Sequence, residues 1–391
     1  MPTLFADAIY HPAGWIHDQG LVLSKRGEVL GWEKHAKGSE AKRVPGILVP
    51  GWVNAHCHLE LSAFGGKVLE QVGMTGFIRS LFTLRRNIGE WAQQEAVTQA
   101  MQRMHEQGTA AVGDISNGLI SLAAKQATPL ATHTFVEILG LDPAEATTRL
   151  EAGKKVQAGF NGLRTSLTPH APYSTSTQLF QAIYQENQGP ISIHLAESQE
   201  EWQLFTQANG AFRDFYRELG IYFQPFDTQD PLDHALKNLP KEVKALLVHL
   251  TEVSPERFAH LRETFPLAWF CLCPRSNWYL HRRLPPIAEL SPELRQRICL
   301  GTDSAASNYS LDLWEEVVFL LNRFPSLSLH EVLRWATTQG AEALGFEDHL
   351  GQFMVGKRPG ILCLEGLNKI QDGFSLGPQS RVRVLHEASL S

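Results

Sequence analysis

The 391-residue sequence has no cluster of basic residues, and its formal net charge is −6. This balance argues against nucleic acid or anionic membranes as partners. No apolar run approaches the ~18 residues of a membrane span, and no basic segment followed by an apolar one marks a secretory signal. Five cysteines, an odd number in a long chain, indicate reduced thiols. We therefore expect a cytoplasmic protein that acts on a small molecule.

Apolar, β-branched runs alternate with amphipathic stretches through most of the chain. The eight runs span residues 47–56, 109–116, 131–139, 162–170, 190–197, 245–250, 267–273 and 297–303. Apolar strands separated by helical patterns are typical of a parallel sheet covered on both faces. One such helix is expected at 89–107, where the apolar positions have helical spacing and the pattern stops at Gly108. Eight β/α units over roughly 250 residues predict an α/β fold of the (β/α)8 TIM-barrel type.

Histidines and an aspartate fall at the ends of these predicted strands. His56 and His58 are two residues apart, so on a strand their side chains point to the same face. The remaining strand-end residues are His170, His194, His249 and Asp303. Catalytic groups of TIM barrels lie at the C-terminal ends of the strands, so we expect a metal site there.

Strand alternation makes a further prediction about faces. Ser192 and His194 share one face of the fifth run, and Cys299, Gly301 and Asp303 share one face of the eighth. By the same rule Ala245, Leu247 and His249 share one face of the sixth run. We therefore expect the side chains of His194, His249 and Asp303 to point the same way as the residues named with them.

The residues at the strand ends resemble those of the amidohydrolase superfamily, in its branch of aminohydrolases and chlorohydrolases. The resemblance covers essentially the whole chain. Its motifs lie at 54–58, 168–174, 194–197, 248–249, 273–277 and 301–304. Within the branch, segments 58–62, 271–277 and 284–286 are most similar to aminodeoxyfutalosine deaminases. The resemblance implies a TIM barrel over residues 47–354 and a small β-sandwich domain built from residues 1–46 and 355–391.

The resemblance also implies the roles of the strand-end residues. It assigns one divalent ion, Zn²⁺ or alternatively Fe²⁺, to His56, His58, His194 and Asp303. Such an ion lowers the pKa of its bound water to about 7 and supplies hydroxide at neutral pH. Asp303 is expected to accept the proton of that water, and His249 to orient it. Glu197 is expected to shuttle protons to the substrate ring and to the departing ammonia.

The fourth run distinguishes one metal ion from two. Binuclear relatives carry a lysine there, and residues 162–170 contain none, so a mononuclear site is expected. His170 is then interpreted as a substrate contact, and Glu60, Asn277 and Asn308 are further candidates. Glu137, near the end of the third run, could reach the substrate, but a structural role is the preferred interpretation.

The function expected from this pattern is hydrolytic deamination of an adenine-type nucleoside, foremost 6-amino-6-deoxyfutalosine of menaquinone biosynthesis. Deamination of adenosine, S-adenosylhomocysteine or guanine is the alternative within the same reaction class. A chlorohydrolase or cyclic amide hydrolase is the alternative outside it, because the same hydroxide serves both reactions. A homodimer is compatible with the resemblance.

Overall fold

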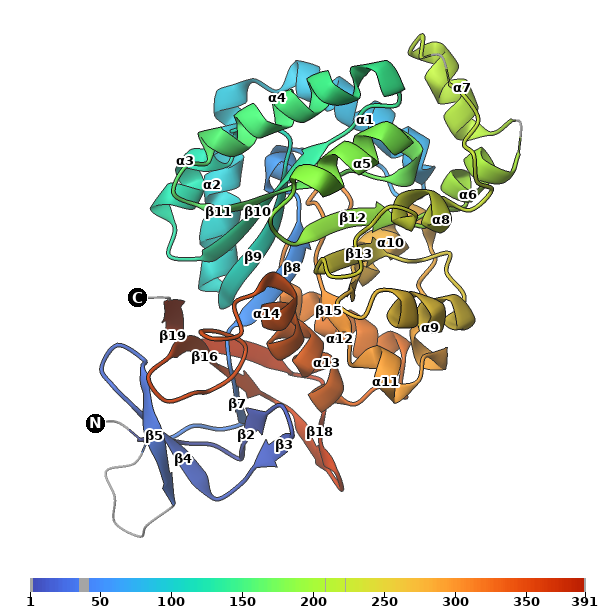
Figure 1. Cartoon of the computed structure of the whole chain (residues 1–391). Coiled ribbons are helices and arrows are strands. Elements are labelled where there is room, and N and C mark those ends of the chain that lie inside the picture. Colours follow the sequence, from blue (N-terminus) through green and yellow to red (C-terminus); the bar gives the residue numbers. More distant parts are fainter. Residues whose placement is uncertain (1–2, 35–41, 208, 222, 390–391) are drawn as a thin grey trace.

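Eight parallel strands form the centre of the protein in the computed structural model, which describes residues 3–34, 42–207, 209–221 and 223–389 (Figure 1). The strands are β8 (Trp52–Cys57), β9 (Thr109–Ser116), β10 (Ala131–Ile138), β11 (Arg164–Pro169), β12 (Ile191–Leu195), β13 (Ala245–His249), β14 (Trp269–Leu272) and β15 (Ile298–Leu300). Hydrogen bonds join β8–β11 into one four-stranded sheet and β12–β15 into another, each in chain order. We call these sheets the first half and the second half of the barrel.

The two halves meet along both edges. At one edge the amide of Thr302, which lies just beyond β15, donates to the carbonyl of His56 in β8 at 3.0 Å. At the other edge the amide of His194 donates to the carbonyl of His170, also at 3.0 Å. The predicted TIM-barrel fold is therefore confirmed.

The first predicted run, residues 47–56, is divided between two sheets. Strand β7 (Ile47–Val49) pairs with β16 (Arg358–Glu365) and with β2 (Ala8–His11), outside the barrel. The barrel begins at Trp52, after Gly51. A Cβ atom at Gly51 would lie 2.8 Å from the carbonyl oxygen of Pro359, so a glycine is needed where the chain passes from one sheet to the other.

Helices cover the outer face of both halves (Figure 1). They are α2 (Glu90–Glu106), α3 (Leu122–Ala127), α4 (Ala146–Gly159), α5 (Thr177–Glu186), α8 (Pro231–Leu236), α9 (Pro255–Thr264), α11 (Pro292–Arg295), α12 (Leu313–Arg323) and α13 (Leu329–Ala336). Helix α14 (Thr338–Leu344) packs instead with Leu246 and Val248 of β13. The helix predicted at 89–107 is α2, which buries Val97, Ala100, Met101 and Met104 as expected. None of the helices among the described residues is long and apolar enough to cross a membrane.

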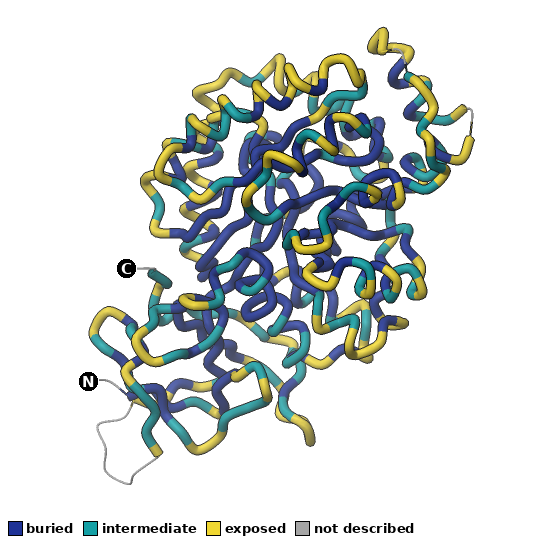
Figure 2. Tube along the Cα trace, in the orientation of Figure 1, coloured by how far each residue is buried: buried dark blue, intermediate teal, exposed yellow. Residues whose placement is uncertain are grey.

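Further helices stand at the end of the barrel where the strands finish. They are α1 (Gly73–Asn87), α6 (Gln199–Thr206), α7 (Ala211–Glu218) and α10 (Pro274–His281), together with the 3-10 turns η1 (Leu59–Phe64), η2 (Pro143–Glu145), η3 (Pro172–Ser174) and η4 (Ile287–Glu289). Figure 2 shows that the barrel strands are buried almost throughout, whereas the exposed residues gather on the outer turns of the helices.

Strands from both ends of the chain form two more sheets beside the barrel. One has the order β19-β16-β7-β2-β3 and the other the order β5-β4-β1-β6. The strands not yet given are β1 (Thr3–Phe5), β3 (Gly14–Ile16), β4 (Gln19–Leu23), β5 (Val29–Lys34), β6 (Lys42–Arg43), β19 (Arg381–Ser389) and the hairpin β17 (Asn368–Ile370) and β18 (Gly373–Ser375). We propose that residues 1–46 and 355–391 form one domain, of which 1–2, 35–41 and 390–391 lie outside the described residues.

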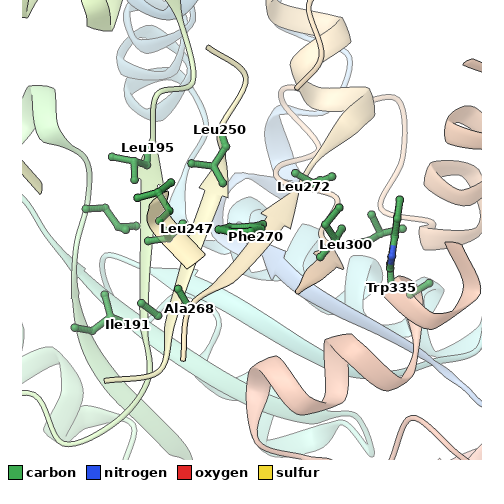
Figure 3. Close-up of a cluster of buried hydrophobic side chains, with 14 of the residues drawn as sticks. Ile191, Leu195, Leu247, Leu250, Ala268, Phe270, Leu272, Leu300 and Trp335 are labelled. Atoms are coloured by element: carbon green, nitrogen blue, oxygen red, sulfur yellow. The ribbon is translucent and has the colours of Figure 1, made fainter. Parts of the chain in front are cut away.

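The largest apolar core lies between the outer face of the barrel and its helices in both halves, and it continues into β2 and β7 beside the barrel. Figure 3 shows Leu247 of β13 beside Phe270 of β14, with Leu300 of β15 next to Trp335 of α13. All four side chains are fully buried. Burial of an apolar side chain of this size contributes about 1.5–3 kcal/mol, so this core holds the second half firmly from outside.

Candidate metal centre and catalytic site

Four predicted site residues converge at the carboxyl ends of the strands. The ligand atoms of His56, His194, His249 and Asp303 all lie within 4.8 Å of one another, and all four residues are buried. His58 lies beside them, with its Nε2 3.0 Å from Nε2 of His194 and 3.3 Å from Oδ1 of Asp303. The structure therefore brings together the four expected metal ligands and the expected orienting histidine.

The backbone of β13 corrects the expected face of His249. Ala245 and Leu247 pack in the outer core with the helices, whereas Leu246 and Val248 belong to a different cluster. Strict alternation would turn His249 outward with Leu247. Its φ of 72°, in the left-handed region, instead turns the ring inward to within 5.5 Å of the His194 ring. The prediction that His249 shares the face of Leu247 was wrong, although the predicted site contains it.

The rings of His56 and His194 are oriented by partners on their Nδ1 atoms. Nδ1 of His56 lies 3.3 Å from the hydroxyl of Ser192, and Nδ1 of His194 lies 3.0 Å from the carbonyl oxygen of His170. Bonds of this kind on one ring nitrogen direct the other toward a metal ion. Nε2 of His56 is buried and, among the described residues, has no hydrogen-bond partner.

Burial sets the protonation states that a metal site needs. It lowers the pKa of His56 and of His194 well below the ordinary value of 6.5, and neighbouring histidines lower both further. Burial alone would raise the pKa of Asp303, but the charges of His58, His249 and His56 outweigh it and lower this pKa to about 2. Neutral imidazoles and an ionised carboxylate are the forms that bind metal ions.

Two hydroxyl groups complete the surroundings of Asp303. Ser276 and Ser307 each donate a hydrogen bond of 2.6 Å to its Oδ2, which leaves Oδ1 toward the histidines. Three imidazoles, one carboxylate and an unpartnered buried nitrogen fit a divalent ion such as Zn²⁺ or Fe²⁺.

Glu197 faces the same point from the loop that follows β12. Its Oε1 lies 3.6 Å from Nε2 of His249, whose Nδ1 donates to Oδ1 of Asn277 at 2.9 Å. The amide of Glu197 donates to the buried carboxylate of Glu201 at 2.9 Å. The backbone of Glu197, the expected proton shuttle, is therefore held in place, and its side chain lies next to His249, the expected orienting histidine.

A cavity of about 1040 Å³ opens over these residues. Its floor is formed by polar side chains: His58, Glu137, His170, His194, Glu197, His249 and Asp303. Its walls are mainly apolar and come from α1 and α7, which contribute Phe77 and Phe215 among others. Apolar walls with a few convergent polar groups are the usual form of a small-molecule site.

The predicted substrate contacts separate into two groups. His170 lines the cavity. Glu60 accepts hydrogen bonds from the amides of Asn117 and Gly118, at 3.1 and 3.0 Å. Among the described residues that line the cavity, Glu60, Asn277 and Asn308 do not occur.

The two asparagines in that second group have protein partners. Asn277 binds His249, as described above, and its Nδ2 donates to the hydroxyl of Thr251. Nδ2 of Asn308 donates to the carbonyl of Thr302 and to Glu316, both at 2.8 Å. Their role as substrate contacts stays a prediction, and the structure gives each of them a supporting role.

Glu137 is the functional candidate that sequence reasoning undervalued. Its carboxylate lines the cavity, and its Oε1 lies 3.5 Å from Nδ1 of His194. That oxygen is buried and has no hydrogen-bond partner among the described residues, whereas Oε2 accepts from Nδ2 of Asn117 at 2.9 Å. Its position at the end of β10 was the available signal.

A buried ion pair supports the site in the first half of the barrel. Nζ of Lys125 lies 2.5 Å from Oδ2 of Asp114, and both side chains are fully buried. Oδ1 of Asp114 accepts a hydrogen bond of 2.8 Å from the amide of Leu59. Because Leu59 follows His58 directly, this pair fixes the backbone that carries a candidate ligand.

Comparison with known proteins adds a family and several relatives. The model of the amidohydrolase family matches residues 47–384. An adenosine deaminase of Helicobacter pylori is 29% identical over 327 residues, which cover 80% of this chain and 77% of that protein. An aminodeoxyfutalosine deaminase of Nitratiruptor is 26% identical over 389 residues, 93% of this chain and 92% of that protein.

Solved structures show the same fold. The structure of aminofutalosine deaminase from Helicobacter pylori in complex with methylthio-coformycin superposes with a TM-score of 0.75. It is 22% identical to this chain and covers 95% of it, with 94% of the other chain matched.

Proposed function

This chain belongs to the amidohydrolase family, and from that premise we propose that it deaminates an adenine nucleoside, foremost 6-amino-6-deoxyfutalosine. One observation carries the proposal: three candidate ligands and two acid/base candidates, Glu197 and His249, line one cavity, with the fourth candidate, His56, buried beside them. The names of the relatives support the same reaction, because they are deaminases of adenine-type nucleosides.

A divalent ion bound by His56, His58, His194 and Asp303 would supply an activated water molecule as the nucleophile. Asp303, ionised over the whole neutral range, accepts a proton as the water attacks the ring carbon that bears the amino group. Glu197 delivers a proton to the adjacent ring nitrogen, and the proton taken up by Asp303 then passes, directly or through Glu197, to the departing ammonia. A positioned acid/base of this kind contributes roughly 10²–10⁴ in rate.

The histidines on the cavity floor have complementary tasks. Because Nδ1 of His249 already donates to Asn277, the Nε2 atom of the neutral ring can act only as a hydrogen-bond acceptor. His170 meets the purine, and burial lowers its pKa, which favours the neutral ring as a hydrogen-bonding partner. The absence of a lysine on β11 supports a single metal ion.

The size of the cavity favours a nucleoside that carries a large substituent over a free nucleobase. About 1040 Å³ lies at the upper end of the range for small-molecule sites, and its walls beyond the floor are mainly apolar. Adenosine or S-adenosylhomocysteine is the second candidate, supported by the relative named adenosine deaminase. We also propose a cytoplasmic location, which agrees with five buried, unpaired cysteines.

Ammonia release from the metal-loaded protein tests the proposal. The panel is 6-amino-6-deoxyfutalosine, S-adenosylhomocysteine, methylthioadenosine, adenosine, guanine and cytosine. We expect one adenine nucleoside to reach a kcat/KM above about 10⁴ M⁻¹s⁻¹. Silence across the panel would overturn deamination, and metal analysis that gives two ions per chain would overturn the mononuclear site.

A further inference from the structure

Two buried histidines face the same oxygen of Glu197. Nε2 of His249 lies 3.6 Å from Oε1 of Glu197, and Nε2 of His281 lies 3.9 Å from that atom. Among the described residues, these are the basic side chains within 4.0 Å of this carboxylate. Both nitrogens are buried and neither has a hydrogen-bond partner in the described part of the chain. Glu197 thus stands between two imidazoles.

The two histidines differ in what they can offer. Nδ1 of His249 donates to the Asn277 amide oxygen, whose own amide nitrogen donates onward to Thr251. A neutral His249 with its proton on Nδ1 has only a lone pair at Nε2, so it cannot donate to Glu197. His281 is free of that restriction, because its Nε2 can carry the proton.

The position of His281 is fixed from outside the cavity. It is the last residue of α10, and the following Arg282 ends the helix with a φ of 54° and donates its amide to the carbonyl of Trp278. The guanidinium of Arg282 forms an ion pair with Glu70. His281 does not line the cavity, whereas Glu197 does, so His281 approaches the carboxylate from behind.

We propose that His281 is a positioning residue that donates its Nε2–H to Oε1 of Glu197 and leaves the other carboxylate oxygen for the substrate. The two atoms lie 3.9 Å apart in the structure, and the proposed bond requires this distance to shorten to hydrogen-bonding range in the free protein. His281 acts through Glu197 and touches no reacting atom. The inference rests on the proposed function for its consequence, but the contact itself does not.

Kinetics of two His281 variants separate this role from general packing. His281→Ala removes the donor, and we expect kcat to fall about tenfold or more with little change in KM, since hydrogen bonds to charged groups are the strong ones. His281→Gln keeps an N–H near the same place and should recover most of kcat. His260→Ala, on the exposed side of α9, serves as the control. A His281→Gln variant as slow as His281→Ala, or a His281→Ala variant as fast as wild type, would overturn the proposal.

A second measurement needs no substrate. The Nε2–H resonance of His281 in ¹⁵N-labelled protein is assigned by its loss in His281→Gln, and we expect it to shift in Glu197→Gln. An unchanged resonance would refute the contact. Failure of the wild-type protein to deaminate any nucleoside would defeat the proposed function alone, because the resonance still decides the role of His281.

Discussion

The two halves of the barrel hold their functional side chains in different ways. In the first half, side chains hold the site: the Lys125–Asp114 pair anchors the amide after His58, and Glu60 binds the loop after β9. In the second half, unusual backbone conformations hold the functional side chains in place. Ala196, His249, Leu250 and Asp303 follow or end its strands with φ between 49° and 72°.

The backbone strain around the candidate site is therefore concentrated in the second half of the barrel. Non-glycine residues in the left-handed region cost of the order of 1–3 kcal/mol each, and they persist only where the surroundings impose them. In the second half these surroundings are close at hand, because Ala196, His249, Leu250 and Asp303 are all buried, and this half also carries Glu197. None of the residues within β8–β11 has a positive φ, and the non-glycine residue with a positive φ in the loops between these strands is Gln71, after β8.

The largest effect is expected in the second half, at Asp303. Asp303→Asn removes the negative charge from the ligand set and the acceptor for the proton of water, so kcat should fall by about 10³-fold or more. Steady-state ammonia release and metal analysis check this. Asp348→Asn, on the surface, is the control. Activity near wild type in Asp303→Asn would remove Asp303 from the mechanism.

The first half is tested by Lys125→Met. Asp114 would keep a buried charge without its partner, which should lower the free energy of unfolding by about 3–5 kcal/mol. Asp114, no longer held by Lys125, should shift and loosen the amide of Leu59 that it binds, which should displace His58 and weaken metal binding about 10–100-fold. Denaturant titration and competition with a chelator measure the two effects. Lys154→Met breaks an exposed pair and should cost at most about 1 kcal/mol; an equal loss in both variants would contradict the role of the buried pair.

Glu197→Gln tests the acid/base group of the second half. The amide cannot carry protons, so kcat should fall at least about 10²-fold while metal content stays at that of wild type. Glu200→Gln, three residues on, is the control, since Glu200 binds the amide of Thr75. A Glu197→Gln variant with kcat close to wild type would show that another group shuttles the proton.

Glu201→Gln is expected to give the smallest effect, visible as a pH dependence. Burial raises the pKa of Glu201 from 4.5 to about 8, so the folded state holds this proton more tightly than the unfolded state. The wild type therefore loses stability as pH rises from 4.5 toward 8, and the variant avoids this loss. Between pH 5 and pH 7 the stability difference should move in favour of the variant by roughly 2 kcal/mol. A difference that does not change with pH would place this carboxyl group in a more polar environment than the structure gives it.

Much of the architecture was predictable because it depends on local patterns. The apolar runs located the barrel strands to within a few residues, and helical spacing located α2. The convergence of the candidate ligands was predictable as well, because the ends of parallel strands lie at one edge of a sheet. The partners of Glu60 and Asn277 were harder to predict, because they lie 57 and 28 residues away in the sequence.

Hydrophobic periodicity and motif spacing are properties of short segments, so the amino-acid sequence alone was enough to identify the fold class, the family and the strand ends that carry the candidate ligands. Only the tertiary structure decided that β7 leaves the barrel, that His249 turns inward against strand alternation, and that His281 reaches Glu197. The physical reason is the same in each case. The sign of a backbone angle and the partner of a buried polar group depend on contacts between residues far apart in the chain.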